Sequence, residues 1–141
     1  GRLDSDSEGL LILTDNGYFQ DKLSNPKNYV YKTYWAQVEN IPNDEALNQL
    51  RQGIRIRDYI TKPAKVKLIE APNIWARSTP IRERKKIPTC WIELKISEGK
   101  NRQVRKMTAA ISIPTLRLIR VGIGDYSLDK LLPGEYSVIE S

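Results

Sequence analysis

The chain has 141 residues and a net charge of +6, and its 40% hydrophobic and 28% charged content is typical of one soluble globular domain with its own core. No apolar run approaches the roughly 18 residues that cross a bilayer, and no signal peptide is apparent, so we expect no membrane partner and a cytoplasmic location. Histidine is absent and Cys90 is the single cysteine, which excludes internal disulfides and histidine-based catalytic couples, and we expect neither metal nor cofactor.

The first third of the chain contains two predicted strands and two predicted helices. Gly9–Thr14 is a short apolar run that predicts a strand followed by a turn. Tyr18–Leu23 predicts a short helix that ends before a proline. Lys32–Glu39 alternates with a period of two residues, which predicts a strand. Asn43–Gln52 has a capping asparagine, an acidic first turn and an apolar stripe, and therefore predicts a helix.

The middle of the chain is predicted to be mostly strand and loop. Ile54–Ile56 and Ala64–Glu70 have the composition of strands. Ala71–Pro88 holds three prolines and little periodicity, which indicates a long loop, and such loops in compact domains are often functional. Thr89–Ser97 alternates cleanly and is predicted to be a strand.

The last third supplies one more helix and two closing strands. After Asn101 we expect a helix of about ten residues that ends before Pro114. Leu116–Ile123 and Tyr136–Ile139 predict strands. Many strands with a few scattered helices indicate an α+β fold with a mixed, largely antiparallel sheet and a few flanking helices, in a single domain over residues 1–141.

Basic side chains gather in three places: a proline-bounded loop, the entrance of the late helix and the strand after it. A loop and a helix entrance are favourable positions for binding an anion. A charge run is also compatible with a plain solvated face, so a surface for RNA or DNA and a solvated face both remain open at this point. The three clusters are Arg82, Arg84, Lys85 and Lys86; Lys100, Arg102, Arg105 and Lys106; and Arg117 and Arg120.

Segments spread over nearly the whole chain resemble, in order, the motifs of one enzyme family. The opening stretch reads Gly-Arg-Leu-Asp-Ser-Asp-Ser-Glu-Gly-Leu-Leu-Ile-Leu-Thr-Asp-Asn-Gly and resembles the signature of the RsuA-type pseudouridine synthases. The second and third motifs of that family resemble Lys32–Tyr34 and Glu98–Met107. Its closing segments resemble Leu116–Arg120 and Leu132–Tyr136.

This resemblance implies the pseudouridine synthase catalytic fold and the isomerisation of uridine in ribosomal RNA without a cofactor. Ile81–Thr89 and Gly124–Leu128 are most similar to the RluE branch, which implies 23S ribosomal RNA as the partner. We expect a monomer. Family members usually carry a further strand segment before the signature, so we expect that upstream N-terminal segment to be missing here.

The resemblance assigns three catalytic residues: Asp4 as the nucleophile, Arg105 as its ion-pair partner and Tyr34 as the side chain that faces the uracil. A guanidinium close to an aspartate favours the nucleophilic anion. Without the family, Asp4 would be taken for a turn or cap residue, Arg105 for a phosphate contact and Tyr34 for a core side chain. Attack at C1′, attack at C6 and a route through a glycal remain open.

The target nucleotide must be flipped out of its stack, and Arg2 is the candidate for filling the space that it leaves. Alternatively, Arg2 pairs with Asp6 or another carboxylate. We expect phosphate contacts beside the target at the helix entrance, and more distant RNA contacts from the basic loop. The rival hypothesis is a non-catalytic RNA-binding or ribosome-assembly domain with the same basic face. The expected RNA-binding residues are Arg2, Arg84, Lys85, Lys86, Lys100, Arg102 and Gln103.

Overall fold

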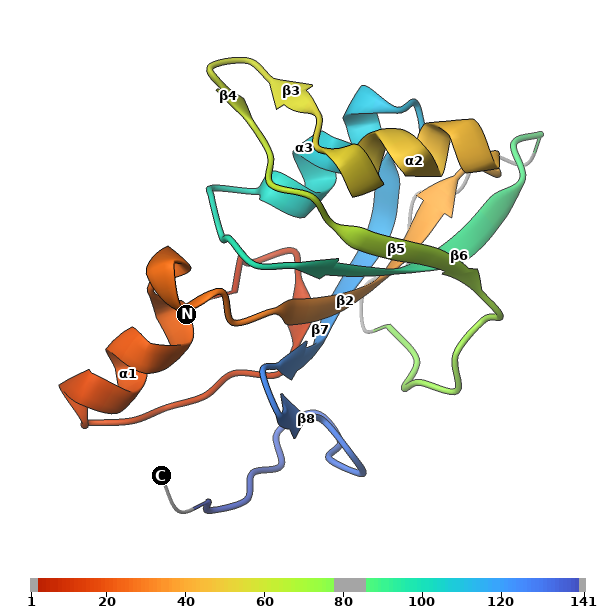
Figure 1. Cartoon of the computed structure of the whole chain (residues 1–141). Helices are drawn as coiled ribbons and strands as arrows, with labels where there is room; N and C mark the ends of the chain where they lie inside the picture. The colour runs from red at the N-terminus through yellow and green to blue at the C-terminus, as the bar shows by residue number, and fades with distance from the viewer. Residues whose placement is uncertain (1–2, 78–85, 140–141) are drawn as a thin grey trace.

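The computed structural model describes residues 3–77 and 86–139, and a six-stranded sheet organises them (Figure 1). Five strands follow one another in the order β1-β7-β2-β6-β5, and β8 pairs with β7. Only the short β1 runs parallel to its neighbour, so the predicted mixed, largely antiparallel α+β fold is confirmed. The strands are β1 (Glu8–Gly9), β2 (Lys32–Glu39), β5 (Lys65–Ile69), β6 (Thr89–Ile96), β7 (Thr115–Ile123) and β8 (Tyr126–Ser127).

Two helices, α2 (Asp44–Gln52) and α3 (Gln103–Ala110), pack on one face of the sheet and close the hydrophobic core. From α3 the core receives Val104 and Met107, which lie three residues apart and so share one face of the helix. The other helices are α1 (Gly17–Ser24), which lies apart from this layer in Figure 1, and the 3₁₀ helix η1 (Pro26–Asn28). None of the helices within the described ranges is long and apolar enough to cross a membrane.

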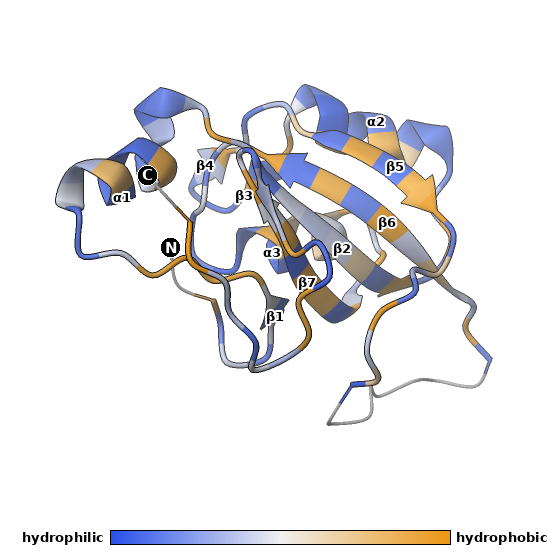
Figure 2. Ribbon diagram, turned by 90° about the horizontal axis from the view of Figure 1, so that it is seen from below, coloured by the Kyte–Doolittle hydropathy of each residue, from blue (hydrophilic) through white to orange (hydrophobic). Residues whose placement is uncertain are grey.

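The regular elements form where the sequence pattern is strongest. The observed β2 has the predicted bounds, and β6 buries Ile92, Leu94 and Ile96 on one face, as its alternating sequence implies. Figure 2 shows the resulting alternation of polar and apolar residues along β5 and β6. At the start of α2, the side chain of Asn43 accepts a hydrogen bond from the Ala46 amide at 2.8 Å, which is the predicted cap.

Two strand predictions are wrong because an apolar run forms a strand only where a partner strand lies beside it. The predicted strand Gly9–Thr14 pairs only at its first residue, since the backbone of Gly9 adopts a φ of +115° and the chain then leaves β7. Leu11 and Leu13 are exposed as a result. Tyr136–Ile139 forms no strand and is also largely exposed.

The sequence patterns also missed two short pieces of pairing. Arg55–Ile56 (β3) and Tyr59–Ile60 (β4) form a separate two-stranded hairpin, of which only the first strand was predicted. The strand β8 follows β7 directly and pairs back onto it. Two-residue strands are too short to show a periodicity in the sequence.

Candidate active site

A cavity of about 320 Å³ opens where the first residues of the chain meet β2, β7 and the start of α3. Its walls include six of the residues predicted from the sequence, and we call it the Asp4 cavity. Its size lies at the lower end of the ~300–1,000 Å³ range of small-molecule sites. The six residues are Asp4, Tyr34, Lys100, Arg102, Gln103 and Arg105.

Strand register brings the opening segment beside Tyr34. In one row across the sheet, Gly9 of β1 lies opposite Arg120 of β7, which lies opposite Tyr34 of β2. Asp4 precedes β1 in a tight turn, in which the Ser7 amide donates to the Asp4 carbonyl oxygen at 3.0 Å. The short parallel pairing of β1 with β7 therefore places Asp4 at the cavity that Tyr34 also lines.

Two carboxylates and two arginines meet at the edge of this cavity. A bidentate pair joins Arg102 to Asp6, with Nη1 to Oδ1 at 3.0 Å and Nη2 to Oδ2 at 2.9 Å. The Nη1 atom of Arg102 also lies 3.5 Å from Oδ2 of Asp4. No other cationic side chain among residues 3–77 and 86–139 comes within 4.0 Å of the Asp4 carboxylate.

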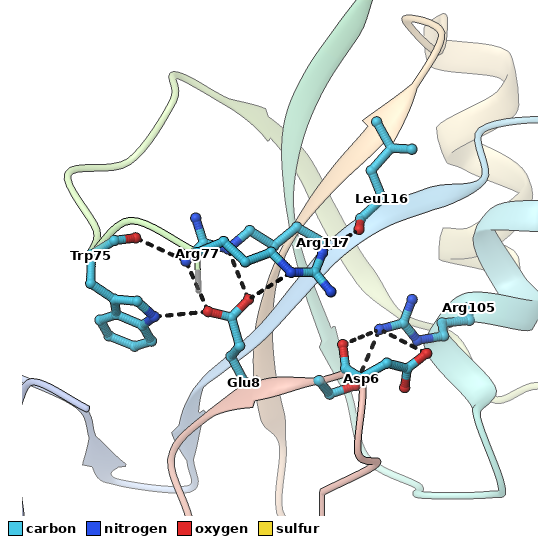
Figure 3. Close-up of polar contacts among 8 residues, drawn as sticks. Asp6, Glu8, Trp75, Arg77, Arg105, Leu116 and Arg117 are labelled. Atoms are coloured by element: carbon cyan, nitrogen blue, oxygen red, sulfur yellow. Dashed lines mark hydrogen bonds and ion pairs between the residues drawn. The ribbon is translucent and has the colours of Figure 1, made fainter. Parts of the chain in front are cut away.

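The position of Arg105 therefore differs from the direct pairing with Asp4 that the resemblance implied. Its Nη2 atom donates to the carbonyl oxygen of Asp6 at 2.9 Å and lies 3.7 Å from Oδ2 of Asp6 (Figure 3). Its Nε–H is buried and has no hydrogen-bond partner among the described residues. Burial lowers the pKa of this guanidinium below its usual value. An unsatisfied buried donor at a cavity wall is a ready site for an incoming oxygen acceptor.

The Asp6 carboxylate gives a pH-dependent prediction. The hydrogen bond from Arg102 lowers the pKa of Asp6 from 3.8 to about 2. A depressed pKa means that the ionised carboxylate stabilises the folded protein above its unfolded pKa, and that this contribution is lost as the pH falls from 3.8 toward about 2. The change will be small, because 44% of the side chain is exposed.

We expect Asp6→Asn to make the melting temperature depend less steeply on pH below pH 3.8. Thermal unfolding of the variant and the wild type, followed by circular dichroism across that range, measures this. Asp15→Asn is the control, because Asp15 is an exposed aspartate of the same signature. Equal acid profiles for Asp6→Asn and the wild type would contradict the Asp6–Arg102 pairing.

Gln103 lies in the site but is not placed to bind RNA as the sequence suggested, because its side chain is only 3% exposed and bonds within the protein. Its Nε2 donates to Oε1 of Glu98 at 2.8 Å, and its Oε1 accepts from the Lys100 amide at 3.1 Å. Glu98 also accepts from the Lys62 amide at 2.8 Å. Gln103 therefore holds the turn that presents Lys100 to the cavity.

The other expected RNA contacts lie elsewhere. Arg2, Arg84 and Lys85 fall outside the described residues. Lys86 is exposed and does not line the Asp4 cavity. Lys100 lines the cavity, and its ammonium group lies 4.1 Å from the ring centre of Tyr59.

Two charged cavity residues, Lys32 and Arg120, were not among the predicted site residues, although Lys32 belongs to the second motif and Arg120 to the third basic cluster. Lys32 lies two residues before Tyr34, so the strand periodicity alone places both on the same face. Burial, reinforced by the charge of Arg120, lowers the pKa of Lys32. Arg120 donates from Nε to the Leu10 carbonyl oxygen at 3.0 Å and so fastens the chain after β1 to β7.

A third carboxylate of the opening segment, Glu8 of β1, joins this strand to β7 and to the chain after β5 (Figure 3). It accepts two hydrogen bonds from Arg117, at 2.8 and 2.9 Å, and one from the Trp75 indole at 2.8 Å. The Nε atom of Arg77 lies 4.0 Å away from it. Burial would raise the pKa of Glu8, but the hydrogen bonds from Arg117 and Trp75 outweigh burial, and the pKa is lowered.

We expect Glu8→Gln to reduce the free energy of unfolding by about 2–3 kcal/mol, because it leaves the nearly buried Arg117 guanidinium without its counter-charge. Urea unfolding at neutral pH measures the loss. Glu70→Gln, at an exposed position just after β5 on the other edge of the sheet, should change stability little. A Glu8→Gln protein as stable as Glu70→Gln would show that the network contributes nothing to folding.

Sequence and structure comparisons agree on one family. Residues 1–110 match the family model described as RNA pseudouridylate synthase. The chain is 51% identical over 140 residues to a protein of Vibrio parahaemolyticus serotype O3:K6 named ribosomal large subunit pseudouridine synthase E, an alignment that covers 99% of this chain and 59% of that relative. It is 54% identical over 134 residues to the protein of the same name from Xanthomonas axonopodis pv. citri, covering 94% of this chain and 70% of that one.

A solved structure titled as a pseudouridylate synthase superposes on 94% of this chain and 50% of its own, with a TM-score of 0.76 and 31% identity. The chain thus spans little more than half the length of some of the proteins that it matches. The match over 110 residues, the identity above 50% and the shared fold show that this chain belongs to the RNA pseudouridylate synthase family.

Proposed function

We propose that this chain is the catalytic core of an enzyme that isomerises a uridine of ribosomal RNA to pseudouridine. The observation that supports this most is the Asp4 cavity, where Asp4, Tyr34 and Arg105 converge from three separate parts of the sequence. Membership of the RNA pseudouridylate synthase family supports it too, because the isomerisation of uridine can be carried out by carboxylate, phenol and guanidinium side chains. The names of the relatives support the large ribosomal subunit, and therefore 23S ribosomal RNA, as the source of the substrate.

The reaction breaks the bond between C1′ and N1 of uridine and forms a bond between C1′ and C5. The proton on C5 is lost and N1 gains one, so substrate and product are isomers. We assign Asp4 as the nucleophile, because a carboxylate anion forms a covalent bond to carbon and leaves again. Attack at C1′, attack at C6 and departure through a glycal all use this same anion.

The neighbouring arginines place positive charge beside the Asp4 carboxylate. Arg102 lies within 3.5 Å of Asp4, and Arg105 lines the same cavity with one buried donor unused. We assign Arg105 to the ion pair with Asp4 in the RNA-bound state, which requires its contact with Asp6 to be exchanged. Tyr34 faces the uracil.

The RNA must present its uridine flipped out of the stack, at a cost of a few kcal/mol. We assign Arg2 to the space that the base leaves, and Lys100 and Arg102 to phosphates beside it. Arg84, Lys85 and Lys86 would contact a more distant part of the RNA. We propose that the chain acts as one domain and as a monomer in the cytoplasm.

The deciding experiment incubates the protein, with and without an added upstream segment, on 23S RNA transcripts and on assembled large subunits. Carbodiimide-blocked primer extension then maps pseudouridine. We expect one modified position. Folded protein that binds these RNAs and modifies none of them would overturn the proposal and favour a non-catalytic ribosome-assembly role for the same basic face.

A further inference from the structure

Beside the Asp4 cavity, three lysines each lie over the ring of a tyrosine. The ammonium group of Lys62 is 4.5 Å from the ring centre of Tyr29, and that of Lys65 is 4.8 Å from the ring centre of Tyr31. Lys100 and Tyr59 form the third pair at 4.1 Å. The first two pairs join the segment between η1 and β2 to the start of β5.

In the part of the chain that the structure describes, these lysines have no acidic partner at ion-pair distance. No carboxylate among the described residues lies within 4.0 Å of Lys62, Lys65 or Lys100, whereas Lys67 on the same strand as Lys65 has Glu93 at 3.9 Å. Tyr29 is 62% exposed, and a left-handed backbone conformation (φ of 52°) holds it there directly after η1. A large exposed ring next to an uncompensated cation is suited to a ligand that is both aromatic and anionic.

Hydrogen bonds through Glu98 and Gln103 connect Lys62 to Lys100 at the active-site cavity. The buried Glu98 accepts from the Lys62 amide and from Gln103, and Gln103 accepts from the Lys100 amide. Lys100 and Lys32 line the cavity, whereas Lys65 lies in one row with Lys95 and Thr33, on the other face of the sheet from Tyr34. The Lys62–Tyr29 pair is therefore the one that these bonds tie to the cavity. The Lys65–Tyr31 pair lies at the start of β5 and just before β2, where a nucleotide flanking the target reaches it by passing round the ends of these strands.

We propose that Tyr29, Tyr31, Lys62 and Lys65 form a binding surface for unpaired RNA nucleotides that flank the target, which we call the tyrosine–lysine surface. A nucleotide offers a base to the ring and a phosphate to the ammonium group. Stacking on a base is stronger than an exposed cation–π contact, so the exchange is favourable. Unpaired nucleotides fit better than a duplex, because the faces of paired bases are covered by their neighbours. This inference rests on the proposed RNA substrate.

The test measures binding of a short fluorescein-labelled oligouridylate by fluorescence anisotropy at low salt. Tyr29→Leu, which keeps an apolar side chain but removes the ring, should weaken binding about tenfold. Tyr29→Phe keeps the ring and should bind as the wild type does. The double variant Lys62→Gln/Lys65→Gln should weaken binding and reduce the slope of log affinity against log salt by about 0.7 for each phosphate that the variant no longer neutralises.

Matched controls separate this surface from general effects. Tyr18→Leu removes a tyrosine that is still more exposed, at 82%, and that has no lysine of the described residues over its ring. Lys67→Gln removes a lysine that already has an acidic partner. Both should bind as the wild type does. Unchanged binding by Tyr29→Leu and by the lysine pair, or an equal loss in the two controls, would overturn the tyrosine–lysine surface.

Measuring pseudouridine formation distinguishes an error in the tyrosine–lysine surface from an error in the proposed enzyme activity. If the wild type forms pseudouridine but Tyr29→Leu binds oligouridylate normally, the surface is wrong and the enzyme assignment stands. If the wild type forms none in ribosomal RNA while Tyr29→Leu and the lysine pair still lose affinity, the enzyme assignment falls and the RNA surface stands. Wild-type protein that binds no oligouridylate at all overturns the surface.

Discussion

Asp4→Asn should reduce pseudouridine formation at least about a thousandfold while leaving the dissociation constant for RNA within about threefold of the wild type. The amide has the shape of the carboxylate but no negative charge, so it cannot supply the nucleophilic anion. The fold should survive, because Asp4 is a partly exposed turn residue whose ion pair with Arg102 is long, at 3.5 Å. This variant should therefore lose pseudouridine formation but keep its affinity for RNA.

Single-turnover pseudouridine formation and RNA binding, measured on the same preparation, check this result. Asp15→Asn is the matched control, because it removes a carboxylate from the same opening segment at an exposed position away from the cavity lining. It should turn over at the wild-type rate. Turnover by Asp4→Asn at that rate would remove Asp4 from the mechanism, and equal loss in both variants would point to a general effect of charge.

Gly9→Ala should lower the free energy of unfolding by at least about 3 kcal/mol. A Cβ atom at Gly9 would lie 2.1 Å from the backbone oxygen of Arg120 and 2.6 Å from its backbone nitrogen, so β1 and β7 must separate. The φ of +115° adds strain for any residue with a side chain. This separation also breaks the strand pairing that places Asp4. We therefore expect pseudouridine formation to fall even at urea concentrations at which the variant is still folded.

Gly17→Ala is the comparison for this variant, because Gly17 begins α1, and a Cβ atom there meets nothing within 4 Å. Its stability should equal or slightly exceed that of the wild type. Urea unfolding monitored by tryptophan fluorescence gives both values, with an unchanged m-value as the check that only stability differs. Similar midpoints for the two variants would show that the close approach at Gly9 is relaxed at little cost.

The sequence predicted those elements whose pattern is long enough to be read locally. Eight alternating residues in β2 and in β6, and the capped, striped helix α2, each repeat their period several times. The apolar run after Gly9 and the segment Tyr136–Ile139 had the composition of strands without a partner to pair with. Strand formation depends on a neighbour that composition does not specify.

The candidate site was identified through the ordered resemblance of its motifs rather than through local chemistry. That resemblance pointed to Asp4, Tyr34 and Arg105, and the cavity contains all three. It did not indicate that Arg102 and Arg105 are held by Asp6, that Gln103 is buried against Glu98, or that Glu8 ties β1 to Arg117.

By itself, the sequence determined the fold class, the family and the residue types that this protein can use for chemistry, because composition, periodicity and motif order are properties of the chain alone. Only the tertiary structure decided which charges meet. Asp6 and Arg102 are 96 positions apart in the chain, and Glu8 and Arg117 are 109 positions apart. Such pairs are set by strand register and by close approaches such as that of Gly9 to β7, which no local pattern encodes.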